Sequence, residues 1–150
     1  MKLLKDILFK VAIESVKGTT DLEVNALHFD SRKVAANDVF FAISGVVSDG
    51  HDFIDKAINN GASVIICECL PELLKEEVTY VKVNNTSEAL ALMASAFYDH
   101  PSQSLILVGV TGTNGKTTVA SMLYALFKNL GFKTGLLSTV NIKIGDANYK

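Results

Sequence analysis

The sequence predicts an α/β fold, with a small mixed α/β domain followed by the beginning of a second, incomplete α/β domain. Strand-like apolar runs alternate with helical periodicities along most of the chain. One unbroken apolar run, LILVGV at residues 105–110, leads into a glycine-rich segment and then into an amphipathic helix. This βα alternation is typical of a parallel or mixed sheet with helices packed on its faces.

Composition and charge limit the classes of protein. The 150 residues are 49% hydrophobic and 20% charged, with a formal net charge of −2. Because the lysines are scattered, we expect neither a nucleic-acid partner nor an anionic-membrane surface. The N-terminal MKLLKDILFKVAI resembles a secretion signal, but Lys5, Asp6 and Lys10 interrupt it, so it predicts an amphipathic first helix. No run approaches the ~20 residues that cross a bilayer, and we expect a cytoplasmic monomer without membrane insertion.

Strands and helices alternate between residues 21 and 83. The predicted strands lie in DLEVNALHFDSR (21–32), DVFFAIS (38–44), SVIICE (63–68) and TYVKV (79–83), and the predicted helices are residues 52–60 and PELLKEE (71–77). Asn37 and Asp38 supply a turn signal between the first two strands. Asp52 is the expected N-cap of the first of these helices, and Gly61 is expected to end it.

A longer helix is predicted in NNTSEALALMASAFYDHP, from residue 84 to 101. Residues 85–87 offer capping side chains, and Pro101 marks the end. Its apolar stripe consists of Leu90, Met93, Ala94 and Phe97. The βα pattern restarts at Leu105, and we place a domain boundary near residue 85, giving domains 1–85 and 86–150.

The cysteines and histidines predict no metal or nucleophilic site. Cys67 and Cys69 point to one face if both lie on a strand, and neither their spacing nor their number makes a zinc site. We therefore expect two buried thiols. The histidines, His28, His51 and His100, are isolated in the sequence, and no catalytic His-Cys or His-Ser arrangement follows from them.

The segment GVTGTNGKTT, at 109–118, is the pattern with the clearest chemistry. LILVGV predicts a parallel strand buried on both faces, and TVASMLYALFKNLG predicts a helix that Gly131 closes. Glycines between a strand and a helix allow positive φ and let backbone amides approach a ligand, and the helix dipole adds positive charge there. This arrangement suits phosphate. Lys116 adds a cation for the β- and γ-phosphates, and Thr117 offers a hydroxyl to Mg²⁺.

The segment departs from the usual G-x-x-x-x-G-K-[ST] pattern. The first glycine of that pattern falls at position 110, which is Val110, while Gly109 and Gly112 flank it. This departure, and the distance of the loop from the N-terminus, disfavour a small P-loop kinase or GTPase. A glycine-rich turn without a function is the alternative interpretation.

GVTGTNGKTT resembles the nucleotide loop of the Mur ligase family, the ATP-dependent amide-forming enzymes of peptidoglycan precursor assembly. Folylpolyglutamate synthetases share a close relative of this loop. FDSRKVAANDVFFAISGVVSDGHDFIDKAINNGASVIICE, at 29–68, resembles the N-terminal UDP-binding domain of the members that add the third residue and the terminal dipeptide. GLLSTVNIKIGD, at 135–146, is similar to the member that adds the third residue. The resemblance implies that residues 1–85 bind the UDP-linked substrate and that 86–150 begin the central ATP-binding domain.

The resemblance also implies a reaction and its residues. The expected activity is ATP-dependent addition of an amino acid to UDP-N-acetylmuramoyl-L-alanyl-D-glutamate through an acyl phosphate, with ATP and Mg²⁺ as cofactors. The UDP-linked dipeptide and an amino-acid acceptor are the expected small-molecule partners. The implied ATP-binding residues are Gly112, Thr113, Asn114, Gly115, Lys116, Thr117 and Thr118, with Lys116 also catalytic and Thr117 also a metal ligand.

The implied substrate-binding residues lie in the first half, and they are Ser31, Arg32, Gly45, Val46, Val47 and Ser48. A serine hydroxyl and exposed amides at a strand end can bond a pyrophosphate or a ribose. Val46 and Val47 are apolar, so any contact there would come from the backbone. The alternatives are a simple turn residue at Ser31 and a surface ion pair at Arg32.

The extent of the chain adds a further expectation. Only 35 residues (150 − 115) follow Gly115, fewer than a nucleotide-binding sheet requires. We expect the front third of a longer ligase that is inactive by itself, with the remaining Mg²⁺ ligands, a modified lysine and the amino-acid domain lying beyond Lys150. The alternatives are the ligase that adds the terminal dipeptide, a folylpolyglutamate synthetase relative, and a non-catalytic nucleotide-binding module.

Overall fold

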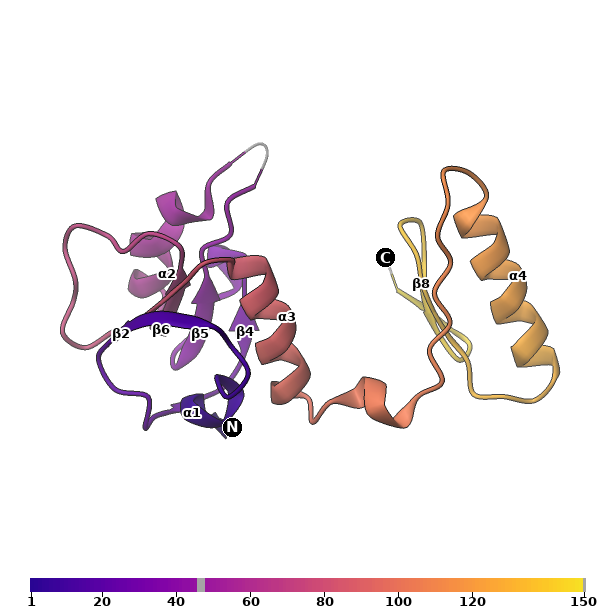
Figure 1. Cartoon of the computed structure of the whole chain (residues 1–150), viewed down its shortest axis with the longest axis horizontal. Helices are drawn as coiled ribbons and strands as arrows, with labels where there is room; N and C mark the ends of the chain where they lie inside the picture. The colour runs from indigo at the N-terminus through magenta and orange to yellow at the C-terminus, as the bar shows by residue number, and fades with distance from the viewer. Residues whose placement is uncertain (46–47, 150) are drawn as a thin grey trace. The chain divides into compact units, whose positions relative to one another are not determined.

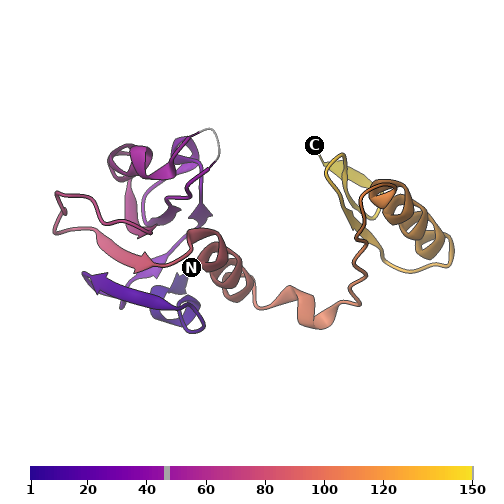
Figure 2. The same ribbon diagram turned by 45° about the horizontal axis from the view of Figure 1, so that its top comes forward.

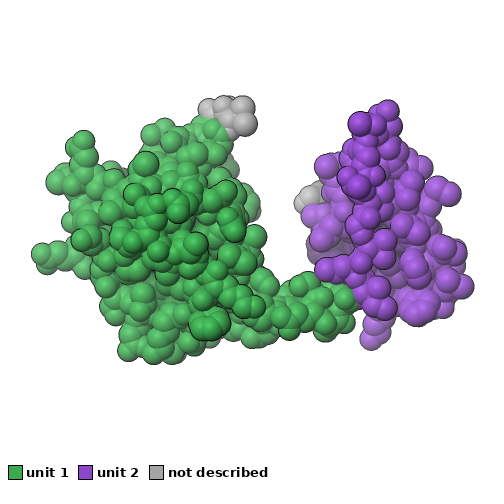
Figure 3. All heavy atoms as spheres, in the orientation of Figure 1, with its two compact units in different colours: residues 1–105 green, residues 106–150 purple. Residues whose placement is uncertain are grey.

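The computed structural model describes residues 1–45 and 48–149, and it divides into two compact units, Met1–Leu105 and Ile106–Lys150 (Figures 1 and 3). This division lies 20 residues (105 − 85) beyond the boundary predicted near residue 85. The difference arises because helix α3 (Thr86–Phe97) packs in the first unit, where Ala89 and Met93 belong to the core.

A mixed five-stranded sheet forms the centre of the first unit (Figure 2). Its strand order is β2-β7-β6-β5-β4. The bounds are β2 Ile13–Lys17, β4 Leu27–His28, β5 Asp38–Phe41, β6 Ala62–Cys67 and β7 Thr79–Val83. The strands β4 to β7 run parallel, and β2 pairs antiparallel with β7. The predicted α/β class is therefore confirmed.

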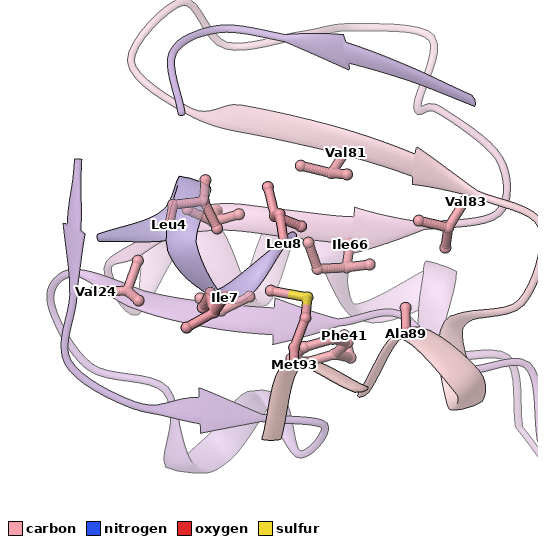
Figure 4. Close-up of a cluster of buried hydrophobic side chains, with 12 residues drawn as sticks. Leu4, Ile7, Leu8, Val24, Phe41, Ile66, Val81, Val83, Ala89 and Met93 are labelled. Atoms are coloured by element: carbon pink, nitrogen blue, oxygen red, sulfur yellow. The ribbon is translucent and has the colours of Figure 1, made fainter. Parts of the chain in front are cut away.

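Each face of this sheet carries its own apolar core. Successive side chains of a strand point to opposite faces. Val64 and Ile66 of β6 accordingly join the cluster that α3 covers, together with the short helix α1 (Leu4–Ile7), and Figure 4 shows that cluster. The next residue of the strand, Ile65, joins the opposite cluster, which includes residues of helix α2 (Ile54–Asn59). The sheet is thus buried on both sides, as parallel strands require.

The strongest local signals act as predicted. Asn37 adopts a φ of 64° in the turn before β5. Gly61 has a φ of +111° after α2, and a Cβ there would come within 2.9 Å of the Ala36 backbone, so glycine is needed for two reasons. Asn85 caps α3 by accepting a hydrogen bond from the Glu88 amide at 2.9 Å.

The predicted amphipathic first helix is wrong in its length. Only α1, four residues long, is helical, because the preceding strand β1 (Lys2–Leu3) pairs antiparallel with β3 (Glu23–Val24). The amides of the first helical residues also bond outside the helix, with Leu4 N donating to Leu22 O at 2.9 Å. The apolar spacing is used for burial, but strand pairing before α1 and turns directly after it limit the helix to four residues.

Two further predictions within the first unit are wrong. Residues 71–77 form turns instead of a helix, and Leu73 is 87% exposed, so an apolar helical face there would bury little. Asp52 does not cap α2, because a 3₁₀-helix at Gly50–Phe53 comes first and Asp49 caps it by accepting from the His51 amide at 2.9 Å.

The second unit consists of helix α4 (Lys116–Asn129) and an antiparallel sheet of three short strands. The strands are β8 Gly135–Leu137, β9 Ile142–Ile144 and β10 Ala147–Tyr149. Gly131 ends α4 as predicted, with a φ of +88° and with bonds from Gly131 N to Lys128 O and from Phe132 N to Phe127 O, both 3.0 Å. These two bonds form a Schellman motif.

The buried strand predicted at residues 105–110 is wrong. The segment has no strand hydrogen bonds in the described chain, and Ile106 is 96% exposed. A parallel strand exists only beside a partner, and none of the described strands runs alongside these residues.

Candidate functional site

The predicted substrate-binding residues lie where two neighbouring parallel strands end. Ser31 follows β4, and Gly45 and Ser48 follow β5, which pairs parallel with β4. Parallel neighbours end at the same edge of a sheet, and loops at the carboxyl edge are the usual ligand sites of α/β folds. The structure thus places these residues on adjacent loops. Val46 and Val47 lie outside the described residues.

Ser31 and Arg32 begin a 3₁₀-helix after β4, and both have protein partners. Ser31 is only 6% exposed, and its carbonyl accepts a hydrogen bond from Asn60 Nδ2 at 2.8 Å. Arg32 donates from Nε and Nη2 to the two carboxylate oxygens of Asp30, at 2.9 and 2.8 Å. This bidentate bond, together with the Arg32 backbone amide, holds the pKa of Asp30 well below its usual range. Arg32 therefore forms the surface ion pair that was its alternative interpretation.

The described residues on the two sides of the loop after β5 are bonded to each other and exposed. Gly45 N donates to Ser48 O at 3.0 Å, and Ser44 forms an isolated antiparallel bridge with Asp49. Both Gly45 and Ser48 are exposed. The loop thereby presents polar groups at the carboxyl edge, which suits the phosphates or the ribose of a nucleotide.

His51, which the sequence did not single out, lies at the end of this loop. Its Nε2 accepts hydrogen bonds from the backbone amides of Glu68 at 3.0 Å and Cys69 at 3.3 Å, both just beyond β6. Its Nδ1 lies 2.7 Å from Asp49 Oδ1. The hydrogen bonds from His51, the backbone bond foremost, lower the pKa of Asp49. The Asp-x-His spacing, which lets Asp49 accept from the amide two residues on, was the one available signal.

The start of α3 is already occupied by a carboxylate of this chain. Glu68 Oε1 accepts from the backbone amide and from the hydroxyl of Thr86, each at 2.9 Å. Helix N-termini favour anions, and here Glu68 supplies the negative charge. This helix end is therefore not free for a phosphate.

The glycine-rich loop of the second unit leads directly into α4. Gly112 has a φ of +145° and Gly115 a φ of +76°, and no atom lies within 4 Å of a Cβ built on Gly115. Gly115 is also the N-cap of α4, and it gives the first turn no side-chain hydrogen bond. The first amides of a 14-residue helix are thus available to an anion.

The Lys116 side chain folds back and bonds carbonyl groups of the same loop. Its Nζ donates to the carbonyl oxygens of Gly112 and of Thr113, the latter at 3.2 Å. Both Thr113 and Asn114 are exposed, as is Thr118 at the start of the helix, whereas Thr117 is half-buried. The seven residues predicted to hold ATP therefore form one short loop and the first turn of the helix that follows it.

Thr117 is the candidate metal ligand. The described residues contain no group of three or more His, Cys, Asp or Glu side chains that could hold a metal ion. A single hydroxyl fits Mg²⁺, which keeps several waters and shares substrate phosphates as ligands.

As for membranes, no helix in the described part of the chain has the length and apolar content to cross a bilayer.

The first unit is a mixed sheet whose parallel strands end in polar loops, and the second has a glycine-rich loop that opens a helix. Both features are typical of nucleotide-binding α/β proteins. The catalytic domain of the Mur ligase family matches residues 23–98, and the Mur ligase middle domain matches residues 110–150. The chain therefore belongs to the Mur ligase family.

Curated relatives match nearly the whole chain. The UDP-N-acetylmuramoyl-L-alanyl-D-glutamate--2,6-diaminopimelate ligase of Cytophaga hutchinsonii is 53% identical over 144 residues, which cover 95% of this chain and 30% of the relative. The UDP-N-acetylmuramyl-tripeptide synthetase of Borrelia garinii subsp. bavariensis is 41% identical, over 98% of this chain and 30% of the relative. The chain thus spans about 30% of the length of these relatives.

Solved structures agree on the fold. The MurF ligase from Thermotoga maritima, in complex with ADP, is 36% identical with a TM-score of 0.55, over 71% of this chain and 24% of that one. A UDP-N-acetylmuramoyl-L-alanyl-D-glutamate--2,6-diaminopimelate ligase structure has a TM-score of 0.69 at 19% identity, over 97% of this chain and 29% of that one. The second likeness shows the fold alone.

Proposed function

We propose that this chain supplies the UDP-substrate site and the ATP phosphate loop of a ligase that adds the third amino acid to UDP-N-acetylmuramoyl-L-alanyl-D-glutamate. One observation carries the proposal: the similarity to the Cytophaga hutchinsonii ligase, 53% identical, runs through both units. The name of that relative makes 2,6-diaminopimelate the favoured amino acid.

In the first unit, the carboxyl edge of the sheet holds the uridine diphosphate part of the substrate. The exposed Ser48 is the main contact, through its backbone amide and its hydroxyl. The exposed Gly45 closes the loop beside it, because its amide donates to Ser48 O. Ser31 is only 6% exposed, so it offers the substrate a small accessible surface. Arg32 lies next to Ser31 and contacts the substrate while it remains paired with Asp30.

In the second unit, residues 112–118 bind the triphosphate of ATP. The amides at the start of α4 neutralise phosphate charge, and Lys116 exchanges its bonds to two loop carbonyls for bonds to phosphate oxygens. Thr117 provides one ligand to Mg²⁺, which when bound neutralises further phosphate charge.

The reaction then has two balanced steps. The substrate carboxylate attacks the γ-phosphorus of ATP, ADP leaves, and an acyl phosphate forms. The amine of the incoming amino acid attacks the acyl carbon, inorganic phosphate leaves, and the amide forms as the nitrogen loses a proton. Lys116 acts in the first step, where charge accumulates on the transferred phosphoryl group.

Substitutions in the phosphate loop test this proposal in the ligase that contains these residues. We expect Lys116→Ala to lower turnover by roughly a thousandfold or more, because it removes the cation that meets the phosphates. Thr117→Ala should raise the Mg²⁺ concentration needed for half-maximal rate. Lys133→Ala, at an exposed lysine of the same unit, is the matched control and should change neither quantity.

A binding measurement separates the two sites. Gly115→Val places a β-branched side chain at a φ of +76° and fills the open space beside the loop, so it should abolish ATP binding. Binding of the UDP-linked dipeptide should remain, since that site lies in the first unit. Normal turnover in Lys116→Ala, or normal ATP binding in Gly115→Val, would show that the loop is only a turn.

A second candidate function is addition of the terminal dipeptide. The 36% identity with the Thermotoga maritima MurF ligase favours it as the runner-up. Substrate choice decides between the two: turnover with the UDP-linked tripeptide and D-alanyl-D-alanine, and none with the UDP-linked dipeptide and a diamino acid, would select this second function.

A further inference from the structure

His51 joins two loops at the carboxyl edge of the first unit. It belongs to the segment that follows β5, and its Nε2 accepts the amides of Glu68 and Cys69, which follow β6. Only 16% of the His51 side chain is exposed, while the Asp49 side chain is 50% exposed. The imidazole is therefore largely enclosed between two loops whose sequence positions differ by 17 and 18 residues.

The hydrogen-bond pattern fixes the tautomer of His51. Backbone amides can only donate, so the Nε2 that accepts two of them carries no proton. The single ring proton is then on Nδ1, which donates to Asp49 Oδ1 at 2.7 Å. The ring is neutral, and its contact with Asp49 is a hydrogen bond to a carboxylate and not an ion pair.

Asp49 extends this contact to the loop that carries Gly45 and Ser48. Its Oδ1 also accepts from the His51 amide at 2.9 Å and from the Ser44 hydroxyl at 3.2 Å. Ser44 and Asp49 form the isolated bridge at the base of the loop. The two loop ends are thereby held to each other and, through His51, to the end of β6.

A catalytic role for this pair is excluded by the same contacts. A general base needs a free nitrogen within reach of the substrate, and Nε2 already has two amide partners. An Asp-His pair with an occupied Nε2 is suited to holding loops in place.

We propose that His51 and Asp49 are positioning residues for the UDP-linked substrate. This inference rests on the proposed function, in which Ser48 contacts that substrate and Gly45 closes the loop beside it. The neutral imidazole fixes the loop base against β6, so that the backbone groups of Gly45 and Ser48 are in place before the ligand binds and less ordering is needed on binding.

The test uses the ¹⁵N-labelled chain titrated with UDP-N-acetylmuramoyl-L-alanyl-D-glutamate, with the amide signals of Gly45 and Ser48 as the readout. We expect His51→Ala to weaken binding roughly tenfold, since three hydrogen bonds that hold the loop are lost. His51→Gln should restore part of the affinity, because its amide offers one acceptor and one donor. Asp49→Ala should weaken binding comparably, and the double variant should be little worse than either single one, since both residues belong to one connected hydrogen-bond network.

His100→Asn is the matched control. It also removes an imidazole that bonds a serine hydroxyl, at 3.0 Å from Ser95 Oγ, but at the end of α3. Its φ of 52° is one that asparagine tolerates, so the fold should be kept and the affinity unchanged. Binding of an ATP analogue should be unchanged in every variant, which separates loop positioning from general loss of structure.

A spectroscopic signature tests the tautomer directly. Histidine ¹⁵N shifts of the ligand-free chain should show a protonated Nδ1 and an unprotonated Nε2 for His51. A proton on Nε2, or equal affinity of His51→Ala and the unchanged chain, would overturn the inference. If the unchanged chain fails to bind the UDP-linked dipeptide, the proposed function itself is wrong and the positioning role falls with it. Core methyl signals of Ile66 and Val81 report whether each variant is folded.

Discussion

At the scale of single residues, burial separates two thiols that look equivalent in the sequence. Cys67 is the last residue of β6 and is fully buried, and this desolvation raises its pKa to about 11. Cys69 follows the end of the strand and is exposed, so the expectation of two buried thiols is wrong for Cys69. The strand ends at Cys67, two residues before Cys69, and so buries only the first of the two thiols.

We expect an alkylating thiol reagent at pH 8 to modify Cys69 rapidly and Cys67 only after unfolding. The thiolate is the reactive species, and a pKa of about 11 leaves Cys67 with very little of it at that pH. Mass spectrometry with time should show one modified cysteine in the folded chain and two in denaturant. Cys69→Ser, the control, should react only in denaturant. Rapid double modification of the folded chain would show that Cys67 is accessible.

At the scale of elements, the sequence was sufficient where the signal is local. Gly61, Asn85 and Gly131 each end or begin a helix through a hydrogen bond to a residue three positions away, and all three act as predicted. The prediction of a strand at 105–110 is wrong because a strand needs a partner strand, which composition does not reveal. The prediction of a helix at 71–77 is wrong because its leucines have no apolar surface to cover.

The same distinction applies to the candidate site. The glycine-rich loop was predicted from consecutive residues at 109–118, and the β5 loop from the family resemblance of the continuous segment 29–68. His51 was missed because its partner amides lie 17 and 18 residues further on. Nothing in the local sequence shows that the end of β6 passes beside it.

The cap of α3 provides a prediction at this scale. Asn85→Ala removes the bond to the Glu88 amide and should lower the free energy of unfolding of the first unit by about 1 kcal/mol. Denaturant titration followed by circular dichroism measures the change. Ser87→Ala, at an exposed position two residues further on, is the control and should stay within about 0.5 kcal/mol. Equal effects of the two substitutions would mean that the cap contributes nothing beyond helix propensity.

At the scale of the whole molecule, the two units differ in how much apolar surface they bury. The first unit has two core clusters, one on each face of its sheet. Among the described residues from 106 onward, Leu136 is the only buried apolar residue. The large apolar side chains that the second unit exposes include Leu107, Val108, Met122, Leu126, Leu130, Phe132 and Leu137. Stability in this chain is therefore concentrated in residues 1–105.

We expect a chain shortened to residues 1–105 to fold alone. About 100 residues suffice for an independent core, and the five-stranded sheet and both core clusters lie within this range. Its amide spectrum should superimpose on the first-unit signals of the full chain, and it should unfold in one cooperative transition. In the full chain, amides of β6 should exchange hydrogen slowest and those of α4 much faster, because a helix without a buried face opens locally. Residues 106–150 alone serve as the comparison and should show no cooperative transition. A disordered 1–105 chain, or equal protection of β6 and α4, would mean that the apparent division of stability between the units is wrong.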